Sequence, residues 1–376
     1  MITKQRAWEN WPLVVDRLRP DAKWDQMPPS LVVLGLFPQL HTLSIDLGRI
    51  QMTRFTKGLA VLAALASFAG PARAEDRPTL KAALYMSGTV AWEVDTIRHN
   101  GFDTAQGFDL EVMDVAGGAA SRIALAAGEV DMIVADWLWV ASQRADGKDY
   151  VFLPYSTAVG GIYVPKDSPA RTLADLKGGK IGIAGGPNDK SWLILRAYAQ
   201  QELGIDIAEN TEQVYGAPPL IFKSALSGEL DGSINFWHFG AKMGASGQRL
   251  LMSTSEAALS LGLDPNTPLL GYVVRGEVLK NNPEMVAGMA QASLDAKALL
   301  AKDDTAWDRL RDRMRVKNDA QFEALKSGWI AGIPPKGPVS EDAAAKMLTL
   351  MGRLGGEDLV GSATTLPEGL FYTPSS

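Results

Sequence analysis

The sequence of 376 residues contains no cysteine and only three histidines. The absence of cysteine excludes disulfide bonds, thiolate metal sites and a cysteine nucleophile. The histidines, at positions 41, 99 and 238, do not form the His-x-x-x-His pair that is typical of zinc sites on helices. Gly-x-Ser-x-Gly elbows, P-loops and the glycine fingerprint of dinucleotide-binding folds are also missing. The sequence therefore predicts no catalytic site, no bound metal and no cofactor.

Long apolar runs are scarce, and the one that stands out lies near the N-terminus. Residues 58–68 (GLAVLAALASF) follow the basic segment 52–57 and precede the small-x-small sequence Ala-Arg-Ala at 72–74. The run is shorter than the roughly 20 residues that span a bilayer, but it suits the apolar part of a secretory signal peptide. We predict a signal peptide at 52–74 and a protein released into the periplasm; a buried core helix is the alternative.

Removal of the signal peptide makes the chain clearly acidic. We interpret residues 1–51, which precede Met52 and have no clear periodicity, as an over-extended N-terminus. Without residues 1–74 the 37 basic and 43 acidic residues fall to 28 and 38, because this segment holds nine basic and five acidic residues. A chain of this charge is a poor candidate for nucleic-acid binding, which needs a basic face. No cysteine follows the apolar run, so a lipid anchor is excluded.

The most informative feature is a short phrase that occurs twice. Residues 124–131 read ALAAGEVD and residues 225–231 read ALSGELD, and an apolar or small-residue stretch follows each copy. Each copy predicts a helix, a turn and a short buried strand, because glycine takes the left-handed conformation at a helix C-terminus without strain. Ligands of open α/β sheets bind beyond the carboxyl ends of strands. The repeat therefore predicts two α/β lobes that face one cleft.

Strand and helix patterns divide the chain between these lobes. We expect the first lobe at 75–162 and the second at 163–268, and we expect 269–376 to return to the first lobe as a strand and a helical C-terminal part. Strands are predicted at 79–85, 108–115, 130–135, 150–155, 161–165, 181–184, 212–215 and 269–275. The longer helices are predicted at 87–104, 191–203, 218–228, 283–300, 305–314, 319–330 and 341–354.

Three glycine-rich loops follow a predicted strand and open a helix, at 86–89, 116–119 and 185–188. Helix N-termini carry unpaired N–H groups and a partial positive charge, so they can hold an anionic group. The candidate ligand contacts in these loops are Ser87, Gly117, Gly118 and Gly186. Ordinary turn chemistry is the alternative, because Gly-Gly pairs are common in turns.

Aromatic and acidic residues gather near the same strand ends. Trp137 and Trp237 occupy equivalent positions in the two repeats, and we expect both in the cleft, where an indole can stack on a planar or cationic ligand. Glu93, Asp136 and Asp189 could hold an amine, a cation or a metal, with helix capping as the alternative. The other candidate ligand contacts are Tyr85, Trp92, Ser191, Asn235 and His238, with core packing as the alternative.

The two repeated phrases and the intervening segment 172–182 (TLADLKGGKIG) resemble periplasmic substrate-binding proteins of ABC importers. The resemblance covers residues 78–300 and points to the group that binds sulfonates, taurine, nitrate or thiamine pyrimidine precursors. It implies a two-lobed type II α/β fold that closes on a small ligand and delivers it to a permease in the inner membrane. It also implies a monomer without enzymatic activity. Ligand contacts in such proteins come from the loops that here lie at 85–87, 117–118, 136–137, 185–191 and 235–238.

The identity of the ligand stays open at this stage. Helix N-termini and the hydroxyls of Ser87, Thr89 and Ser121 suit a sulfonate. The tryptophans and nearby acids suit a cationic or heteroaromatic molecule, and a metal complex is a third possibility. A periplasmic ligand sensor, or a binder of a metal ion or metal complex, is the alternative function. The cysteine-rich motif of the eukaryotic pyrimidine-synthesis relatives is absent, so their chemistry is not carried over.

Overall fold

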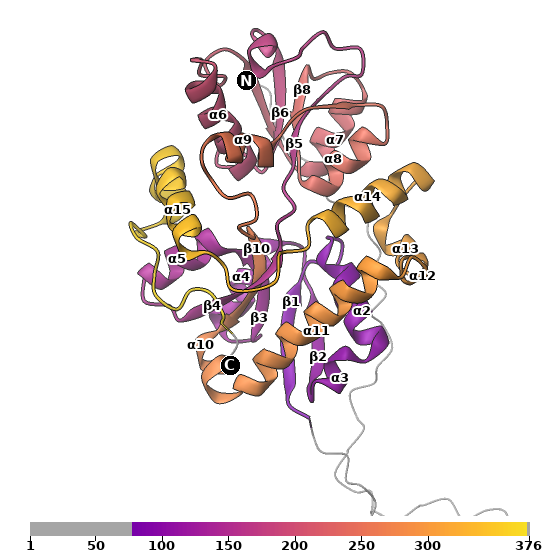
Figure 1. The fold of residues 1–376 in the computed structure, drawn as a ribbon, viewed down its shortest axis with the longest axis vertical. Coiled ribbons are helices and arrows are strands. Elements are labelled where there is room, and N and C mark those ends of the chain that lie inside the picture. Colours follow the sequence, from indigo (N-terminus) through magenta and orange to yellow (C-terminus); the bar gives the residue numbers. More distant parts are fainter. Residues whose placement is uncertain (1–76, 374–376) are drawn as a thin grey trace, which may run out of the picture. The chain divides into compact units, whose positions relative to one another are not determined.

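The structure, a computed structural model, describes residues 77–373 (Figure 1). The predicted signal peptide at 52–74 and the preceding residues 1–51 lie outside the described residues. Within 77–373, no helix is both long and apolar enough to cross a membrane. The described chain contains two five-stranded sheets with helices packed around them, which confirms the predicted α/β class and the two lobes.

The first sheet has the strand order β2-β1-β3-β10-β4. The three parallel strands β1, β2 and β3 are followed by β10 and β4, and β10 runs antiparallel to both of its neighbours. The sheet therefore combines a parallel half from the start of the chain with a strand that returns from far downstream. Its strands are β1 (Thr79–Leu84), β2 (Asp109–Asp114), β3 (Met132–Asp136), β4 (Tyr150–Ser156) and β10 (Leu270–Arg275).

The second sheet follows the same plan, with the order β7-β6-β8-β5-β9. Here β6, β7 and β8 are parallel, and β5 is antiparallel to β8 and β9. The first and second sheets thus match strand for strand, with β3 equivalent to β8. The strands are β5 (Gly161–Val164), β6 (Lys180–Ala184), β7 (Glu212–Gly216), β8 (Gly232–Ile234) and β9 (Arg249–Ser253).

The repeated motif forms the same connection between a helix and a strand in both sheets. Gly128 and Gly228 follow the helices with φ of 74° and 80°, in the left-handed region that glycine favours. The aspartate that ends each phrase then binds the neighbouring strand: Asp131 accepts a hydrogen bond from the backbone N–H of Lys81, and Asp231 from that of Lys180. The phrase is therefore a structural device that turns a helix into a strand and fixes the register of that strand.

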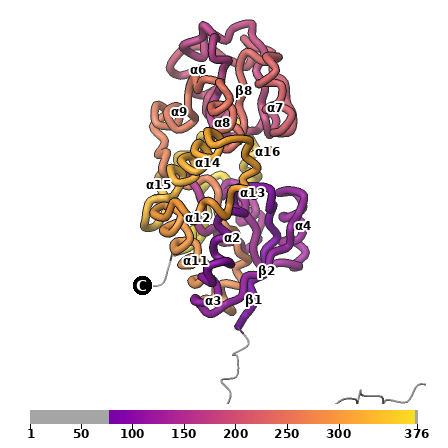
Figure 2. Tube along the Cα trace, turned by 90° about the vertical axis from the view of Figure 1, so that its right-hand side faces the viewer, coloured from indigo at the N-terminus to yellow at the C-terminus, as the bar shows by residue number. Residues whose placement is uncertain are grey.

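Helices cover both faces of the first sheet. Figure 2 shows α4 on one side of the sheet and α11 with α2 on the other. The helices that belong to this part of the chain are α2 (Val90–Asn100), α3 (Phe102–Ala105), α4 (Gly118–Ala127), α5 (Trp137–Ala145), α10 (Gly276–Asn281), α11 (Pro283–Lys302), α12 (Thr305–Asp308) and α13 (Arg311–Met314). Gly101 separates α2 from α3 with a φ of 66°, so the single helix expected at 87–104 is wrong.

The second sheet is packed with α6 (Lys190–Glu202), α7 (Pro218–Leu226), α8 (Trp237–Gly244) and the short 3-10 helix η1 (Leu173–Leu176). A capping box of Thr172 and Asp175 begins η1. The helices α5 and α8 occupy segments that the sequence indicated only as polar-aromatic loops. Both helices begin at a tryptophan that the sequence predicts as a ligand contact: α5 at Trp137 and α8 at Trp237.

The chain passes from the first sheet to the second at 157–160 and returns at 254–269, a segment that contains α9 (Thr254–Ser260). The C-terminal helices add further links. The helix α14 (Asp319–Ala331) packs against α8, and α15 (Glu341–Gly355) and α16 (Glu357–Val360) pack against α6 and α5. The carbonyl of Gly332, at the end of α14, accepts hydrogen bonds from the backbone N–H and the hydroxyl of Thr157. The C-terminal part is helical, as expected, and connects both lobes.

Candidate functional site

The predicted site lies where strands end and helices begin. The helices α2, α4 and α5 start after strands of the first sheet, and α6, α7 and α8 after strands of the second. We call the loops and first turns at these six points the strand-end region: residues 85–89, 116–118, 136–137, 186–191, 217–218 and 235–237. No side chain caps α2, α4, α7 or α8. Backbone carbonyls accept some of their first-turn N–H groups, such as those of Trp92, Leu220 and Phe239, and the others are available to a ligand or to water.

An ion pair joins the two lobes within the strand-end region. The carboxylate of Asp136, at the end of β3, lies 3.2 Å from the ammonium of Lys190, the first residue of α6. The Arg122 guanidinium of α4 lies 3.4 Å from the same carboxylate oxygen and sits over the ring of Trp139. The other carboxylate oxygen of Asp136 accepts the backbone N–H of Trp139 and so caps α5. The carboxylate of Asp136 therefore pairs with two cationic side chains and also caps a helix.

Several predicted contacts remain open to an incoming molecule. The Tyr85 side chain is 48% exposed, and Phe236, which the sequence did not single out, is 46% exposed. Gly117, Gly118 and Gly186 face open space, because a Cβ atom built at any of them would meet no other atom within 4 Å. A ligand could approach the backbone closely at these three positions.

The C-terminal part supplies a residue that sequence patterns could not reveal. The Arg315 guanidinium donates a hydrogen bond of 3.0 Å to the hydroxyl of Ser87. The ammonium of Lys242, from α8, donates to the carbonyls of Met314 and Arg315 at 3.0 and 3.2 Å. Arg315 is also the one non-glycine residue of 77–373 with a positive φ, 51°. The segment around Arg315 therefore connects the first loop of one lobe to a helix of the other.

Trp137 is not in the predicted place. Its side chain is fully buried and packs edge-on against Phe371, with ring centroids 5.8 Å apart. The reason is packing: Trp137 is the first residue of α5, and Phe371, from the end of the chain, lies against its indole. The Trp137 side chain cannot reach a ligand in this conformation, and we withdraw it as a contact.

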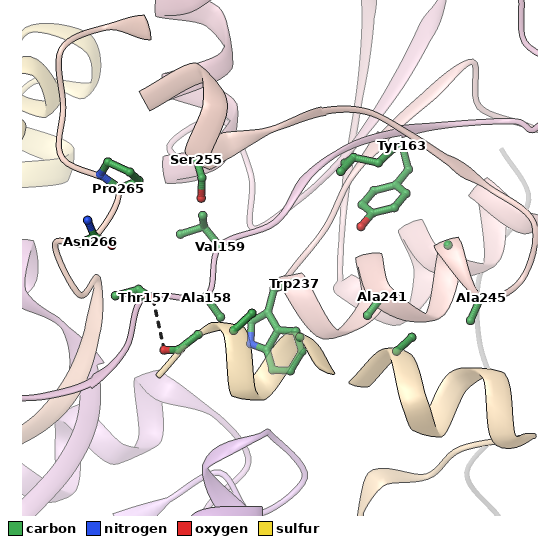
Figure 3. A pocket seen from close by; sticks show the side chains of 16 residues that line it. Thr157, Ala158, Val159, Tyr163, Trp237, Ala241, Ala245, Ser255, Pro265 and Asn266 are labelled. Atoms are coloured by element: carbon green, nitrogen blue, oxygen red, sulfur yellow. Dashed lines mark hydrogen bonds between the residues drawn. The ribbon is translucent and has the colours of Figure 1, made fainter. Parts of the chain in front are cut away.

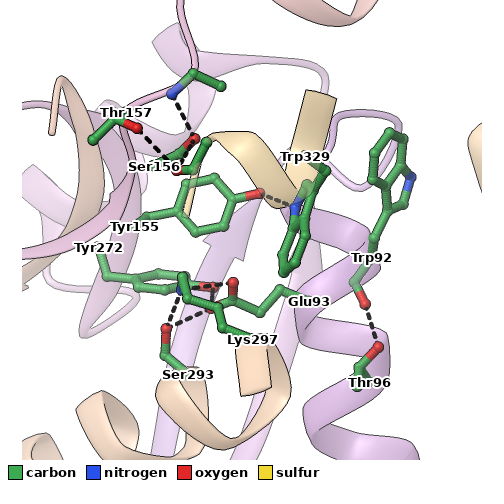
Figure 4. A network of polar contacts seen from close by, with 12 residues as sticks. Trp92, Glu93, Thr96, Tyr155, Ser156, Thr157, Tyr272, Ser293, Lys297 and Trp329 are labelled. Carbon is green, nitrogen blue, oxygen red and sulfur yellow. Dashed lines mark hydrogen bonds and ion pairs between the residues drawn. The ribbon is translucent and has the colours of Figure 1, made fainter. Parts of the chain in front are cut away.

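Trp92 and Glu93 also belong to the interior rather than to the strand-end region. Trp92 is 3% exposed and contacts Trp307 and Trp237 edge-on. Glu93 is fully buried, and its carboxylate accepts hydrogen bonds from Lys297 at 2.7 Å and from Tyr272 at 2.9 Å (Figure 4). Trp92 is therefore withdrawn as a ligand contact, and Glu93 cannot hold a ligand cation.

The buried network around Glu93 is closed by neighbouring groups. Ser293 donates to Glu93 and accepts from Lys297, and the hydroxyl of Tyr155 accepts the indole N–H of Trp329 on α14. Burial lowers the pKa of Lys297, while Glu93 opposes that shift. Every charged group in the network therefore has a partner within the protein, and the hydrogen bond between Tyr155 and Trp329 connects the first lobe to α14 (Figure 4).

Two further predicted residues of the second lobe, Asp189 and Asn235, have structural roles. Asp189 caps α6 by accepting the backbone N–H of Trp192, and burial raises the pKa of its carboxyl. Asn235 is buried; its amide donates to the carbonyl of Pro218 and accepts the N–H of Phe236. Ser191 is half-buried in the first turn of α6.

His238 lies among aromatic rings. Its ring is 4.6 Å from that of Phe239 and 5.9 Å from that of Trp237, centroid to centroid. Burial, with a smaller contribution from the charge of Lys242, lowers the pKa of His238 to about 4. The imidazole is therefore neutral at physiological pH. No metal ligand set accompanies it, since nowhere in 77–373 do three His, Asp or Glu side chains come together in a way that could hold a metal ion.

Trp237 lines a cavity at the edge of the strand-end region. This cavity has a volume of about 630 Å³ and lies between α8, α14 and the two connections between the lobes (Figure 3). Figure 3 shows Trp237 over α14 and Tyr163 on the opposite wall. We call it the α14 cavity; its other named walls are Thr157, Ala158, Val159, Ala241, Ala245, Ser255, Pro265 and Asn266. Of the thirteen predicted contacts, only Trp237 lines it.

The comparisons with known proteins agree with this geometry. The family model described as NMT1/THI5 like matches residues 97–306. No curated protein sequence matches the chain. Similar solved structures include the periplasmic aliphatic sulphonate binding protein SsuA from Escherichia coli, with a TM-score of 0.63, 18% identity, and coverage of 79% of this chain and 92% of that chain.

Two further solved structures show the same fold. The alkanesulfonate-binding protein SsuA from Xanthomonas axonopodis pv. citri, bound to MOPS, has a TM-score of 0.60 and 17% identity, over 80% of this chain and 99% of that chain. A ligand-binding component of an ABC-type import system from Staphylococcus aureus, with zinc bound, has a TM-score of 0.56 and 13% identity, over 74% and 92%. These likenesses confirm the type II periplasmic binding protein fold.

Proposed function

The chain belongs to the NMT1/THI5-like family, and from this premise we propose that it is the solute-binding component of an ABC importer. It captures a small organic ligand between its lobes and delivers it to a permease in the inner membrane. The contact between Asp136 and Lys190 carries the proposal, because this ion pair of 3.2 Å shows that side chains from the strand-end loops of the two lobes reach one another.

The ligand site we propose is the open part of the strand-end region. Tyr85 and Phe236 supply two exposed aromatic faces, one from each lobe, and Gly117, Gly118 and Gly186 supply accessible backbone. A planar group between two such faces would lose much of its contact with water when the lobes approach. Of the residues predicted from the sequence, we retain Tyr85, Ser87, Gly117, Gly118, Asp136, Gly186 and Ser191 as the proposed site, with Asp189, Asn235 and His238 as its support.

The charges in this region favour a ligand with an anionic group. Arg122, Lys190 and Arg315 are cationic, and the uncapped start of α4 adds backbone N–H groups. Asp136 is the carboxylate that pairs with Arg122 and Lys190, and Asp189, which caps α6, is a second carboxylate in this region. An anion that enters would compete with Asp136 for Lys190 and Arg122 and would gain charge-assisted hydrogen bonds. Sulfonates and carboxylates with a planar body fit this description.

The residues offer no support for turnover. Catalysis by a nucleophile needs a side chain such as serine within hydrogen-bond reach of an activating base. The histidine of this region, His238, is held neutral among Trp237, Phe239 and Phe236. We therefore propose binding without reaction, in a monomer that resides in the periplasm.

Native mass spectrometry tests the proposal. The protein is expressed from Met52 and purified from the periplasm without denaturation, and the expected result is a retained small mass at one copy per chain. The matched variants are Tyr85→Ala, in the strand-end region, and Leu294→Ala, on α11, whose side chains are 48% and 50% exposed. The retained mass should disappear in Tyr85→Ala and persist in Leu294→Ala.

Two results would contradict the proposal. One is equal retention of the ligand by both variants. The other is the absence of any retained mass together with no thermal shift on addition of sulfonates, carboxylates, pyrimidines or amines. Secretion is a separate readout: a mature chain that retains residues 52–74 would show that the signal peptide is assigned wrongly.

A further inference from the structure

The α14 cavity has a composition different from that of the strand-end region. Its sixteen lining residues include aromatic rings, hydroxyls, an amide and small apolar side chains, but no charged residue. A volume of about 630 Å³ falls in the range of small-molecule sites, which is roughly 300–1,000 Å³. We infer that the α14 cavity is a second small-molecule site, which takes an uncharged planar molecule that carries a hydroxyl or carbonyl group.

The two rings of the cavity are held in fixed positions. A Cβ atom at Gly328 would lie 2.8 Å from the ring of Trp237, and one at Gly240 would lie 2.7 Å from the ring of Tyr163. Glycine at these places allows α14 to approach the indole and α8 to approach the phenol. Rings packed against backbone in this way present rigid faces, which lowers the entropy lost when a planar ligand stacks on them.

Small residues on the facing helices create the space between these rings. Ala241 and Gly244 lie three positions apart on α8, and Ala245 directly follows the helix. Ala324, Gly328 and Ala331 lie at similar spacing on α14. Residues at this spacing share one helix face. Two helices that meet through larger side chains would close this space, so the cavity follows directly from the sequence of both faces.

Polar groups without protein partners point to a ligand with a polar atom. The Tyr163 hydroxyl makes no hydrogen bond to any residue of 77–373. A smaller cavity adjoins the first through the shared residues Thr157, Val159, Ser255 and Pro265. Its walls include the hydroxyls of Thr254 and Thr267, which are 1% and 6% exposed as residues and have no hydrogen-bond partner. Unlike the α14 cavity, this smaller cavity also has two charged residues in its lining, Lys190 and Asp264. Buried hydroxyls are normally satisfied, so they indicate a polar group between them.

The absence of charge in the lining decides the class of ligand. A charged group placed there would lose its hydration without gaining an ion pair, which is strongly unfavourable. A neutral ring system with one hydroxyl loses little hydration and can exchange hydrogen bonds with Tyr163 or Ser255. The charged ligand of the strand-end region is therefore excluded from the α14 cavity, and the two sites select different molecules.

Occupancy of the cavity would also favour the present arrangement of the lobes. Its walls come from the second lobe, from both connections and from α14, whose Trp329 binds Tyr155 of the first lobe. A ligand that contacts all three holds them together. Any effect on the affinity of the strand-end region is then reciprocal, as thermodynamic linkage requires.

Isothermal titration calorimetry with two matched probes tests the inference. 2-Naphthol is planar, neutral at pH 7 and carries one hydroxyl, whereas naphthalene-2-sulfonate has the same rings and a negative charge. The expected result with the full mature protein is saturable binding of 2-naphthol. Ala245→Phe, which fills the cavity, should weaken this binding at least tenfold, and Ala127→Phe, on the exposed side of α4, should not change it.

A milder pair of variants keeps the test valid if Ala245→Phe fails to fold. Tyr163→Phe removes only the hydroxyl and should weaken 2-naphthol binding about fivefold, the effect of one lost hydrogen bond. Tyr198→Phe is the control: the half-buried Tyr198 lies on α6, and its variant should not change the affinity for 2-naphthol. Tyr85→Ala should leave the affinity for 2-naphthol unchanged.

The outcomes separate this inference from the proposed function. Absence of saturable 2-naphthol binding, equal affinity in wild type and both cavity variants, or loss of binding in Tyr85→Ala would each overturn the inference. Binding of naphthalene-2-sulfonate that Ala245→Phe abolishes would overturn the assignment of an uncharged ligand. None of these results bears on the mass retained in native mass spectrometry, which tests the strand-end region alone.

Discussion

The helices α5 and α8 start at equivalent points of the two lobes, yet their first residues differ completely in environment. Trp137 is fully buried under Phe371, whereas Trp237 is partly exposed and lines the α14 cavity. The residue before each tryptophan differs as well: Asp136 caps α5 and binds Lys190, and Phe236 leaves α8 uncapped and is itself exposed. Equivalent backbone positions therefore carry unlike chemistry in the two lobes.

The cause of this difference lies in what covers each helix. Residues from the end of the chain reach the first lobe and place Phe371 against Trp137 and Phe152. The helix α14 instead approaches α8 through small residues, which leave a cavity beside Trp237. The duplicated sequence motif specifies the connection between helix and strand in both lobes. The C-terminal part of the chain then buries the start of α5 in the first lobe and leaves a cavity beside the start of α8 in the second.

The largest expected effect separates the two tryptophans. Trp137→Ala should lower the free energy of unfolding by about 3–5 kcal/mol, because it leaves a large cavity in the core. Trp237→Ala should cost about 1–2 kcal/mol, because the ring is already partly exposed and has space beside it. Urea unfolding of both variants checks the contrast, and equal losses would remove the distinction between the lobes.

The two aspartates of the repeated phrase give the next largest difference. Asp131 binds the N–H of Lys81 and also pairs with Arg275 at 2.7 Å, whereas Asp231 binds the N–H of Lys180. Asp131→Ala should cost about 2–4 kcal/mol, since it also removes the nearer of the two carboxylates that pair with the partly buried Arg275, and Asp231→Ala about 1–2 kcal/mol. Thermal unfolding measures both. A larger loss for Asp231→Ala would show that the joint is not equivalent in the two sheets.

The third prediction concerns the pH dependence of stability that arises from His238, on α8 of the second lobe. Its pKa is lowered from 6.5 to about 4 in the folded protein, so between these values the unfolded chain binds the extra proton. Stability should therefore fall as the pH decreases from 7 to 4, by about 3 kcal/mol from this residue. His238→Gln should flatten the pH profile of unfolding, and His99→Gln, at an exposed position of α2, should not.

The smallest expected effect tests the ion pair between the lobes. Asp136→Asn keeps an oxygen that can cap α5 but releases Lys190 and Arg122 for a ligand anion. We expect about threefold tighter binding of the native ligand and a steeper dependence on salt, because more of the attraction is then electrostatic. Binding titrations at two salt concentrations measure this. Weaker binding in Asp136→Asn would indicate a cationic ligand.

Sequence patterns predicted the fold well because its signals are local. Gly128 and Gly228 mark helix ends that only a left-handed residue fits, and the apolar stretches after them are strands, so the two lobes follow from short segments. The family resemblance rests on the same segments. The sequence pattern predicts too long a helix at α2, because the pattern does not reveal that Gly101 is left-handed and separates α2 from α3.

The direction of the site side chains could not be predicted in this way. Trp137 and Trp237 look alike in sequence, and only packing from residues more than 90 positions away decides which one is buried. Arg315 reaches Ser87 across 228 residues. Arg122 and Lys190 were within reach of sequence reasoning, because each lies in the first or second turn of a helix that begins at a predicted loop.

The most direct test of the account is the distance between the lobes with and without ligand. The chain has no cysteine, so Ile123→Cys on α4 and Leu220→Cys on α7 can be labelled without background, and both side chains are well exposed, at 71% and 56%. Energy transfer between dyes at these positions is measured in protein stripped of its retained ligand and again after that ligand is returned. The account predicts a saturable increase in transfer as the strand-end region closes. Unchanged transfer at full occupancy would contradict capture between the lobes.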